Sequence, residues 1–430
     1  MSARPGVLLS LLLLCGFFSA VTFKEQQPAG ERAASLLARS LSSSGGARVV
    51  AVGRATEEDR RFTQALQRLL AVPGHPAVVA LHGDPRELRE GLAALGPRAG
   101  ERLLVAAPAS YAATARALLG SLPELAGEVV SPPSYRWPTF LLADNLRNVA
   151  NQIAVIAILA IGMTLVVVTG GIDLSVGSLV ALSAVAVAAL VGRLGAEACP
   201  PPGMLAAGAA SMALCAAAGG LSGLLITRFA VPPFIATLGL MQVASGLAYL
   251  LSEGKPIHRL PEGFVVLGRG ADPLLGVPYA VWTMALLYVL AHLLLSRTVL
   301  GRHLYAVGGN AEAARLAGVR VGGVVLLAYV ASGALAGLGG IVTASQLKSG
   351  APTYGLMYEL YVIAAVVVGG TSLAGGEGTV VGTLLGALII AVIQNGMNLT
   401  NVESYTQKVV LGLVILGAVL LDRRKRQRPR

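Results

Sequence analysis

The sequence predicts an all-α polytopic membrane protein with about ten transmembrane helices and an inserted small α/β extracytoplasmic domain after the first helix. Three observations lead to this fold class. The 430 residues are 55% apolar and only 13% charged, which is about half the charge of an ordinary soluble chain. Long apolar segments recur along the chain, and one polar stretch, residues 24–137, interrupts them. This composition excludes a disordered chain, a collagen-like fibre and a polar nucleic-acid binder.

Apolar segments of about 17 residues or more mark the membrane crossings. They lie at residues 6–23, 148–169, 176–194, 204–227, 233–252, 278–296, 324–345 and 405–421, with shorter or interrupted ones at 358–371 and 378–397. An even number of crossings puts both termini on one side of the membrane. Six of the last eight residues are basic, so the tail, residues 422–430, is expected in the cytoplasm. Both termini are then cytoplasmic, and the loop at 346–357 falls outside.

The first apolar segment, within residues 1–23, has two interpretations. A basic Arg4 ahead of an apolar run is also typical of a cleaved signal peptide. Phe18 occupies the position where a small residue belongs ahead of a cleavage site at Ala20, so we expect a retained transmembrane anchor.

Residues 24–137 have the composition of a soluble domain, with 14 Lys or Arg and 11 Asp or Glu. Strand-like runs alternate with amphipathic stretches, in the order 48–52, 56–71, 77–81, 84–95, 103–107 and 110–122. Alternation at this spacing predicts a small parallel α/β layer. The insert contains no phosphate-binding loop, so its role is docking or spacing on the outer face, and the sequence does not choose between these.

A glycine-rich break follows the second crossing, within Gly162–Ser178. Gly170 and Gly171 permit backbone angles closed to other residues, and Asp173 with Ser175 can cap the helix that follows. A carboxyl group at the edge of a crossing is costly and therefore also a candidate for contact with a transported solute or a partner. A similar pattern recurs at Val366–Gly378 with Glu377, and it indicates either an internal repeat or a coincidence.

A basic loop, Gly301–Val319, contains a short helix with clear end signals. Asn310 is a good N-cap, Gly318 suits the left-handed position after the last turn, and Glu312 can pair with Arg315. Two turns of helix are too short to stand alone in water. The segment therefore either packs into a groove of another protein or lies on the membrane surface as an ordinary connection.

Several kinds of chemistry have no motif in this chain. No ATP-binding loop, zinc-protease motif or nucleophile elbow occurs. The three cysteines, Cys15, Cys199 and Cys215, lack metal-ligand spacing, so we expect no metal site and no cofactor. Energy for uphill transport must then come from a partner or from a gradient.

From Leu141 to Leu421 the chain resembles the permease subunit of bacterial ABC sugar importers, in the ribose/xylose/autoinducer branch of the branched-chain permease superfamily. Four phrases carry the resemblance, in order: GMTLVVVTGGIDLSVGS at Gly162–Ser178, PPFIATLGL at Pro232–Leu240, GRHLYAVGGNAEAARLAG at Gly301–Gly318 and VVGGTSLAGGEGTVVGTLLG at Val367–Gly386. The resemblance implies that residues 138–421 form the permease transmembrane domain. The insert at 24–137 departs from that family, whose members usually have a brief external loop there.

The resemblance also implies a function and partners. The chain is expected to import a monosaccharide or similar small polar solute across the bacterial inner membrane, with no enzymatic activity of its own. The implied partners are a cytoplasmic ABC ATPase subunit, a periplasmic solute-binding protein, a second permease subunit of the same or another kind, and the lipid bilayer, but no nucleic acid. In that family the loop matching Gly301–Gly318 contacts the ATPase, which implies the coupling residues Gly309, Asn310, Glu312, Ala313, Arg315, Leu316 and Gly318.

Alternating access is the expected mechanism, in which the ATPase moves the coupling helix and reorients the crossings. Candidate residues for the translocation path or its gating are Gly170, Gly171, Asp173, Ser175, Thr237, Gln242, Glu377 and Asn395.

Two other functions compete with this one. A gradient-driven secondary transporter would need ionisable groups near the middle of a crossing, whereas Asp173 and Glu377 lie at crossing ends and His292 near one. A membrane-anchored receptor would sense its ligand through the insert.

Overall fold

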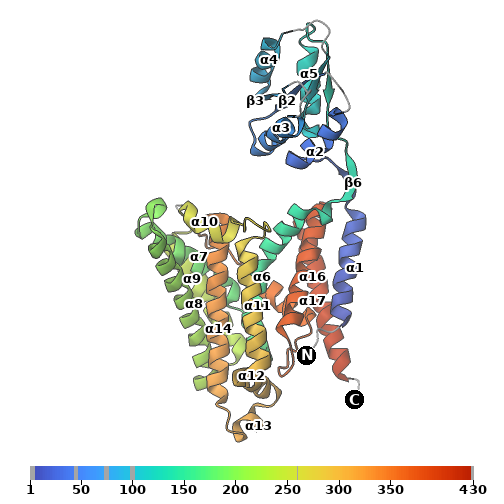
Figure 1. Cartoon of the computed structure of the whole chain (residues 1–430). Helices are drawn as coiled ribbons and strands as arrows, with labels where there is room; N and C mark the ends of the chain where they lie inside the picture. The colour runs from blue at the N-terminus through green and yellow to red at the C-terminus, as the bar shows by residue number, and fades with distance from the viewer. Residues whose placement is uncertain (1–4, 43–46, 72–76, 97–101, 259, 428–430) are drawn as a thin grey trace. The chain divides into compact units, whose positions relative to one another are not determined.

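The computed structural model describes residues 5–42, 47–71, 77–96, 102–258 and 260–427, and it divides into two compact units (Figure 1). One unit joins Met1–Thr22 to Phe140–Arg430, and the other is the intervening stretch Phe23–Thr139. Residues 428–430 of the expected basic tail and residues 1–4 of the expected anchor lie outside the described residues.

The unit Phe23–Thr139 is an α/β structure. Its elements are β1 Phe23–Gln26, α2 Gly30–Leu41, β2 Arg48–Gly53, α3 Glu57–Leu70, β3 Val79–His82, α4 Pro85–Ala94, β4 Leu103–Ala106, η1 Ala109–Tyr111, α5 Ala112–Gly120, β5 Gly127–Val130 and β6 Tyr135–Pro138. Four strands form a parallel sheet in the order β3-β2-β4-β5. The remaining two, β1 and β6, pair as an antiparallel ribbon.

The helices of this unit begin where the sequence supplies caps. The Thr56 hydroxyl accepts a hydrogen bond from the Asp59 backbone N–H, and Asp84 forms a reciprocal capping box with Glu87. Apolar clusters lie on both faces of the sheet, with Phe62 in one and Leu92 in the other. The insert therefore has its own core.

The second unit is helical. Its elements are α1 Pro5–Val21, η2 Thr139–Leu141, α6 Ala143–Val168, α7 Val176–Arg193, η3 Ala196–Ala198, α8 Pro201–Phe229, α9 Pro233–Ser252, α10 Glu262–Arg269, α11 Tyr279–Arg297, α12 Val299–Gly309, α13 Ala311–Leu316, α14 Val321–Leu347, α15 Tyr358–Val368, α16 Val380–Leu399 and α17 Ser404–Gln427. Among the described residues, seven helices are long and apolar enough to cross a membrane: α6, α7, α8, α9, α11, α14 and α16. Three shorter apolar helices lie within α1, α15 and α17. This is the mostly helical, polytopic architecture that the composition predicts.

The helices differ in how much of their surface other helices cover. The most apolar stretch of α6 is 89% buried, whereas those of α8, α9 and α11 are 28% buried. An apolar helix that stays uncovered on most sides is stable in contact with lipid. The core of the bundle is therefore built around α6, with α7 and α14 packed beside it.

The helices α8 and α14 pack closely because small residues face each other. A Cβ atom added to Gly333 would lie 2.2 Å from the carbonyl oxygen of Cys215, and one added to Gly219 would lie 2.2 Å from that of Tyr329. Small residues allow such backbone approach inside a bilayer, where van der Waals packing holds helices together.

Two apolar helices, α7 and α15, each follow a stretch of irregular chain, and we call each stretch with its helix an interrupted crossing. The helix α7 begins only after residues 169–175, and α15 begins only after residues 348–357. From Gly350 on, the expected external loop at 346–357 instead packs along α7. Gly350 lies against the backbone of Ala184, and Gly355 lies against that of Gly177. Irregular backbone at this depth is tolerated where protein surrounds it or where it lines a cavity.

The close approach of α8 and α14 can be tested by adding one methyl group. We expect Gly333→Ala to lower the melting temperature of the detergent-solubilised protein, since overpacking costs about 1–3 kcal/mol. Gly246→Ala on α9 is the matched control, because no atom lies within 4 Å of the added Cβ. Equal melting temperatures for the two variants would contradict this packing.

Candidate functional site

The break after α6 is centred on a buried carboxyl group. Asp173 has no exposed surface, and its Oδ1 accepts hydrogen bonds from the Ser175 backbone N–H at 3.0 Å and the Ser175 hydroxyl at 2.6 Å. Its Oδ2 accepts one from the Ser332 hydroxyl on α14 at 2.7 Å. A buried carboxyl group is costly unless donors surround it, and these three donors are well placed. Asp173 therefore fastens the break to α14.

The same break receives two further hydroxyl groups at the carbonyl oxygen of Ile172. Tyr329 of α14 donates to it at 3.3 Å, and Thr237 of α9 lies 3.4 Å from it. The structure thus brings Thr237 to the break predicted from sequence, together with Asp173 and Ser175. All three contact protein here, and none of them lines the cavity described below.

The second break, residues 369–379, touches the first. The Gly376 N–H donates a hydrogen bond to the carbonyl oxygen of Val168 at 2.9 Å. Gly375 packs against Gly170, and both have a positive φ, +83° and +84°, which glycine adopts without strain. Glu377 is exposed in this break, and its carbonyl oxygen accepts a hydrogen bond from Ser372. The two glycine-rich breaks therefore meet at their backbones.

The helix α12 completes this contact. A Cβ atom added to Gly308 would lie 1.7 Å from the Val168 carbonyl oxygen and 2.6 Å from the Gly376 nitrogen. We call this meeting of three backbones the glycine junction, formed by Val168, Gly170, Gly308, Gly375 and Gly376.

A tyrosine on α12 strengthens the junction. The Tyr305 hydroxyl donates to the Gly378 carbonyl oxygen at 2.7 Å. Burial raises the pKa of Tyr305, so the hydroxyl remains a donor at neutral pH.

The short helix α13 follows α12 directly. The Asn310 side chain accepts a hydrogen bond from the Ala313 N–H at 2.9 Å, and Arg315 pairs with Glu312 at 3.1 Å. Gly318 has a φ of +85°, as expected after the last turn, and the Leu316 side chain is 84% exposed. Figure 1 shows α13 at one end of the bundle, where α1 also begins and α17 ends. The exposed Leu316 side chain is accessible to another protein.

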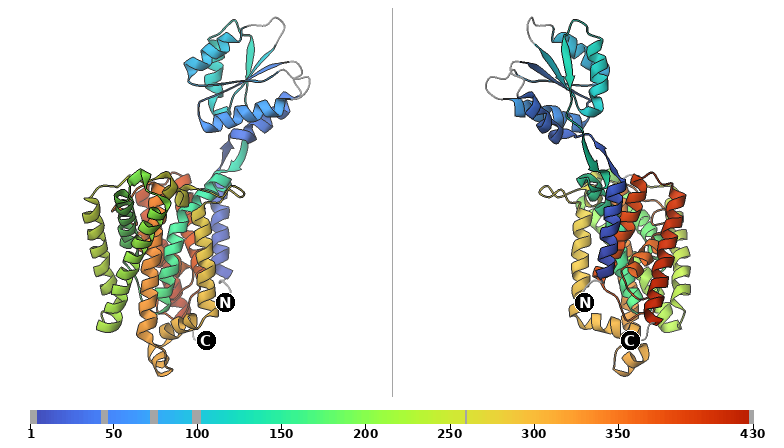
Figure 2. Two further views of the ribbon diagram at one scale, coloured as in Figure 1. Left: turned by 60° about the vertical axis from the view of Figure 1, so that its left-hand side comes forward. Right: turned by 90° about the vertical axis from the view of Figure 1, so that its right-hand side faces the viewer.

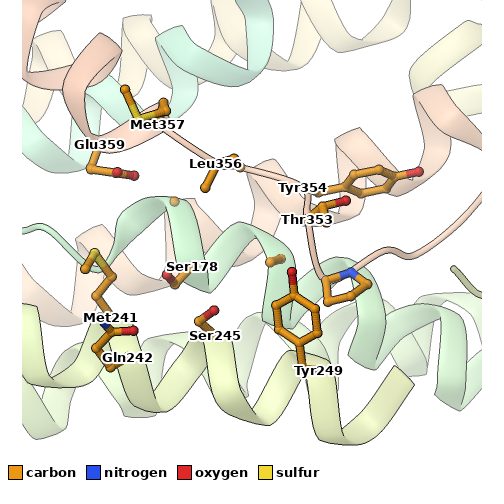
Figure 3. Close-up of a pocket in the computed structure, with 14 residues that line it drawn as sticks. Ser178, Met241, Gln242, Ser245, Tyr249, Thr353, Tyr354, Leu356, Met357 and Glu359 are labelled. Carbon is orange, nitrogen blue, oxygen red and sulfur yellow. The ribbon is translucent and has the colours of Figure 1, made fainter. Parts of the chain in front are cut away.

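Gln242 lies elsewhere, in a cavity of about 220 Å³. Figure 3 shows Ser178 of α7, Gln242 and Ser245 of α9, and Glu359 of α15 around this space. The irregular segment 352–357 forms another wall. The cavity is therefore bordered by both interrupted crossings.

Asn395 forms a different kind of contact. Its side-chain amide exchanges two hydrogen bonds with that of Asn145 at 2.9 and 3.0 Å, which ties α16 to the first turn of α6. Reciprocal amide pairing gives each of these half-buried side chains a donor and an acceptor. Asn395 therefore does not share the cavity with Gln242.

Sequence reasoning missed Glu359 and Gly308. Glu359 lies in the first turn of the apolar helix α15. A lone carboxyl group at the start of an apolar segment is visible in the sequence and could have identified Glu359 as a candidate functional residue. The sequence does not identify residues 352–357 as a cavity wall, because their composition is that of an external loop. Gly308 cannot be told from Gly309 by sequence, and only the packing separates them. No group of three or more His, Cys, Asp or Glu able to hold a metal occurs among the described residues.

The role of Asp173 in fastening the break can be tested with two variants. We expect Asp173→Leu to lower the free energy of unfolding, since each buried donor left without an acceptor costs about 1–3 kcal/mol. Asp173→Asn keeps one acceptor oxygen and gains an N–H group that can donate to Ser332, so it should lower the free energy of unfolding by less than Asp173→Leu. The readout is the fraction of protein that stays monodisperse after heating, and equal losses for both variants would contradict the assignment.

The glycine junction makes a separate prediction. Gly308→Ala should force α12 away from the two breaks and raise deuterium uptake at the backbone amides of Val299–Gly309 and 369–378. Gly309→Ala is the control, because no atom lies within 4 Å of its added Cβ. Unchanged exchange in Gly308→Ala would show that the three segments are not held together.

The known proteins similar to this chain are permease components of transport systems. Residues 145–419 match the family described as branched-chain amino acid transport system / permease component. The ribose import permease protein RbsC of Escherichia coli K12 is 45% identical over 290 residues, covering 67% of this chain and 88% of that protein. The Bacillus subtilis 168 protein of the same name is also 45% identical over 290 residues, covering 67% of this chain and 87% of its own length.

The L-arabinose transport system permease protein AraH of E. coli K12 is 36% identical over 293 residues, covering 68% of this chain and 87% of its own length. No solved structure matches the chain significantly. The chain therefore belongs to the branched-chain transport permease family and is a permease subunit of an ABC sugar importer rather than an enzyme.

Proposed function

We propose that this permease imports a pentose such as ribose, and that ATP hydrolysis by a separate ATPase subunit bound to α13 drives the import. Relatives named for ribose and arabinose import, and the lack of an ATP-binding loop in the sequence, support this proposal. The observation that carries it is the position of α13. This exposed helix continues directly from α12, whose Gly308 packs into the glycine junction. A push on α13 would therefore reach the end of α6 and the second break, residues 369–379.

The arrangement in the membrane follows from the same end of the bundle. Seven long and three shorter apolar helices would give ten crossings. The described chain begins and ends at the end of the bundle that carries α13 (Figures 1 and 2). With α13 in the cytoplasm, both termini are cytoplasmic and residues 24–137 form an extracytoplasmic domain. The basic residues after α17 support this orientation.

The importer is proposed to assemble from several chains. Two permease subunits would enclose the path, two ATPase subunits would contact the two α13 helices, and a periplasmic binding protein would deliver the solute. The residues offered to the ATPase are Gly309, Asn310, Glu312, Ala313, Arg315, Leu316 and Gly318. The insert at residues 24–137 would serve docking or spacing on the outer face, since it lies outside the family match at 145–419.

A gradient-driven transporter is the second candidate, and Glu359 is the observation that favours it. This carboxyl group borders the cavity between α7, α9 and α15. Protons coupled through it would drive uptake without ATP. Reconstituted vesicles separate the two functions: ATP-driven import continues after an ionophore collapses the proton gradient, whereas gradient-driven import stops.

The coupling helix can be tested with one charge. We expect Leu316→Glu to weaken co-purification of the ATPase subunit at least tenfold, because the leucine that the bound ATPase would bury is replaced by a charged group. ATP-dependent uptake of labelled ribose into proteoliposomes should fall with it.

Leu274→Glu is the matched control. Leu274 is 91% exposed in the connection between α10 and α11, at the opposite end of the bundle (Figure 1). ATPase retained at full stoichiometry by Leu316→Glu would overturn the coupling assignment.

A further inference from the structure

We propose that the cavity between α7, α9, α15 and residues 352–357 is a binding site for the solute during translocation, and that it selects an uncharged polyhydroxyl ring of pentose size. This inference rests on the proposed import function and names the place in the chain where the solute is recognised. Four observations on the described residues support it: the meeting of two helix N-termini, the size of the cavity, its polar lining and its charge.

The two interrupted crossings are arranged in opposite senses. In the first, irregular chain at 169–175 precedes α7, and α7 ends before Leu194. In the other, irregular chain at 348–357 precedes α15 and packs antiparallel along α7, with Gly350 near Ala184 and Gly355 near Gly177. The first turns of α7 and α15 therefore meet at the cavity, part of whose lining, such as Leu356, is exposed.

The contact between those first turns is close. A Cβ atom added to Gly177 would lie 2.4 Å from Glu359 Oε2 and 2.4 Å from the Gly355 carbonyl oxygen. The first N–H groups of a helix lack intrahelical acceptors and carry a partial positive charge. In many secondary transporters the ends of discontinuous helices point at the solute site within the membrane. Here both ends border the same cavity.

The size of the cavity fits one small sugar. Its volume of about 220 Å³ corresponds to about seven water molecules at about 30 Å³ each. A pentose with about ten non-hydrogen atoms is of comparable size.

The lining supplies the hydrogen-bonding groups that a sugar requires. Hydroxyl groups come from Ser178, Ser245 and Tyr249, and an amide comes from Gln242 (Figure 3). Leu356 and Met357 border the same space and offer apolar contact to the carbon face of a ring. A cavity with a few convergent polar groups and an apolar wall is typical of small-molecule sites.

The charge of the lining favours an uncharged solute. Glu359 is the one acidic residue around the cavity among the described residues, and no Lys, Arg or His borders it. Its carboxylate lies in the first turn of α15, where negative charge balances the partial positive charge of the helix end. A sugar phosphate would be repelled by this carboxylate and would find no Lys, Arg or His at the cavity to pair with, whereas a neutral sugar can donate hydroxyl hydrogens to Glu359.

The test uses the complete importer reconstituted with its ATPase subunits. We expect Glu359→Gln and Gln242→Leu each to raise the KM for ribose uptake at least tenfold. Thr283→Val on α11 is the control, since its hydroxyl donates only within its own helix, to Tyr279, and should leave KM within about twofold. Unchanged KM in both cavity variants would overturn the proposal.

A second measurement does not depend on transport. In a chain with its native cysteines replaced, a cysteine introduced by Ser245→Cys should react with a small methanethiosulfonate reagent, and saturating ribose should slow that reaction at least fivefold. Equal rates with and without ribose would overturn the site. If the unsubstituted importer takes up neither ribose nor arabinose, the proposed function fails instead, so the two failures are distinguishable.

Discussion

The close contact of three backbones at the glycine junction is the constraint on which the rest of this structure depends. Gly308 lies so near Val168 and Gly376 that no side chain fits between them. Packed interiors transmit displacement because they have few voids and low compressibility. We therefore expect a shift of α12 to displace the end of α6 and the second break. Because α13 follows α12 directly, this contact is the proposed route from the exposed helix to the bundle.

The interrupted crossings are the second element of the account, because they bring helix ends inside the bundle. At the first break the Asp173 carboxyl group accepts hydrogen bonds from the Ser175 N–H and from the hydroxyl groups of Ser175 and Ser332, although no side chain caps the first turn of α7 itself. At the same end of α7, in its first turn, Gly177 borders the cavity that we propose for the solute. In this interrupted crossing, the Asp173 break is held to α14 and the first turn of α7 borders the cavity. We expect a displacement at the glycine junction to change the cavity by moving the Asp173 break.

Much of this arrangement could be predicted from local sequence, and the rest could not. Asn310 and Gly318 mark the ends of α13 because capping is a local property, and the glycine pair before Asp173 reveals a break for the same reason. Pairings across the fold leave no local signal. Asn395 therefore could not be separated from Gln242, although one pairs with Asn145 and the other lines the cavity. The segment 348–357 has a loop's composition, and only its packing along α7 shows that it lies inside.

The most direct test of the central claim is the side of the membrane on which α13 lies. Leu316→Cys, in a chain whose three native cysteines are replaced by serine, can be labelled with an impermeant maleimide in oriented vesicles. The account predicts labelling in inside-out vesicles alone, with protection by the bound ATPase subunit. Labelling of Leu316→Cys in right-side-out vesicles would place α13 at the exterior and contradict the account.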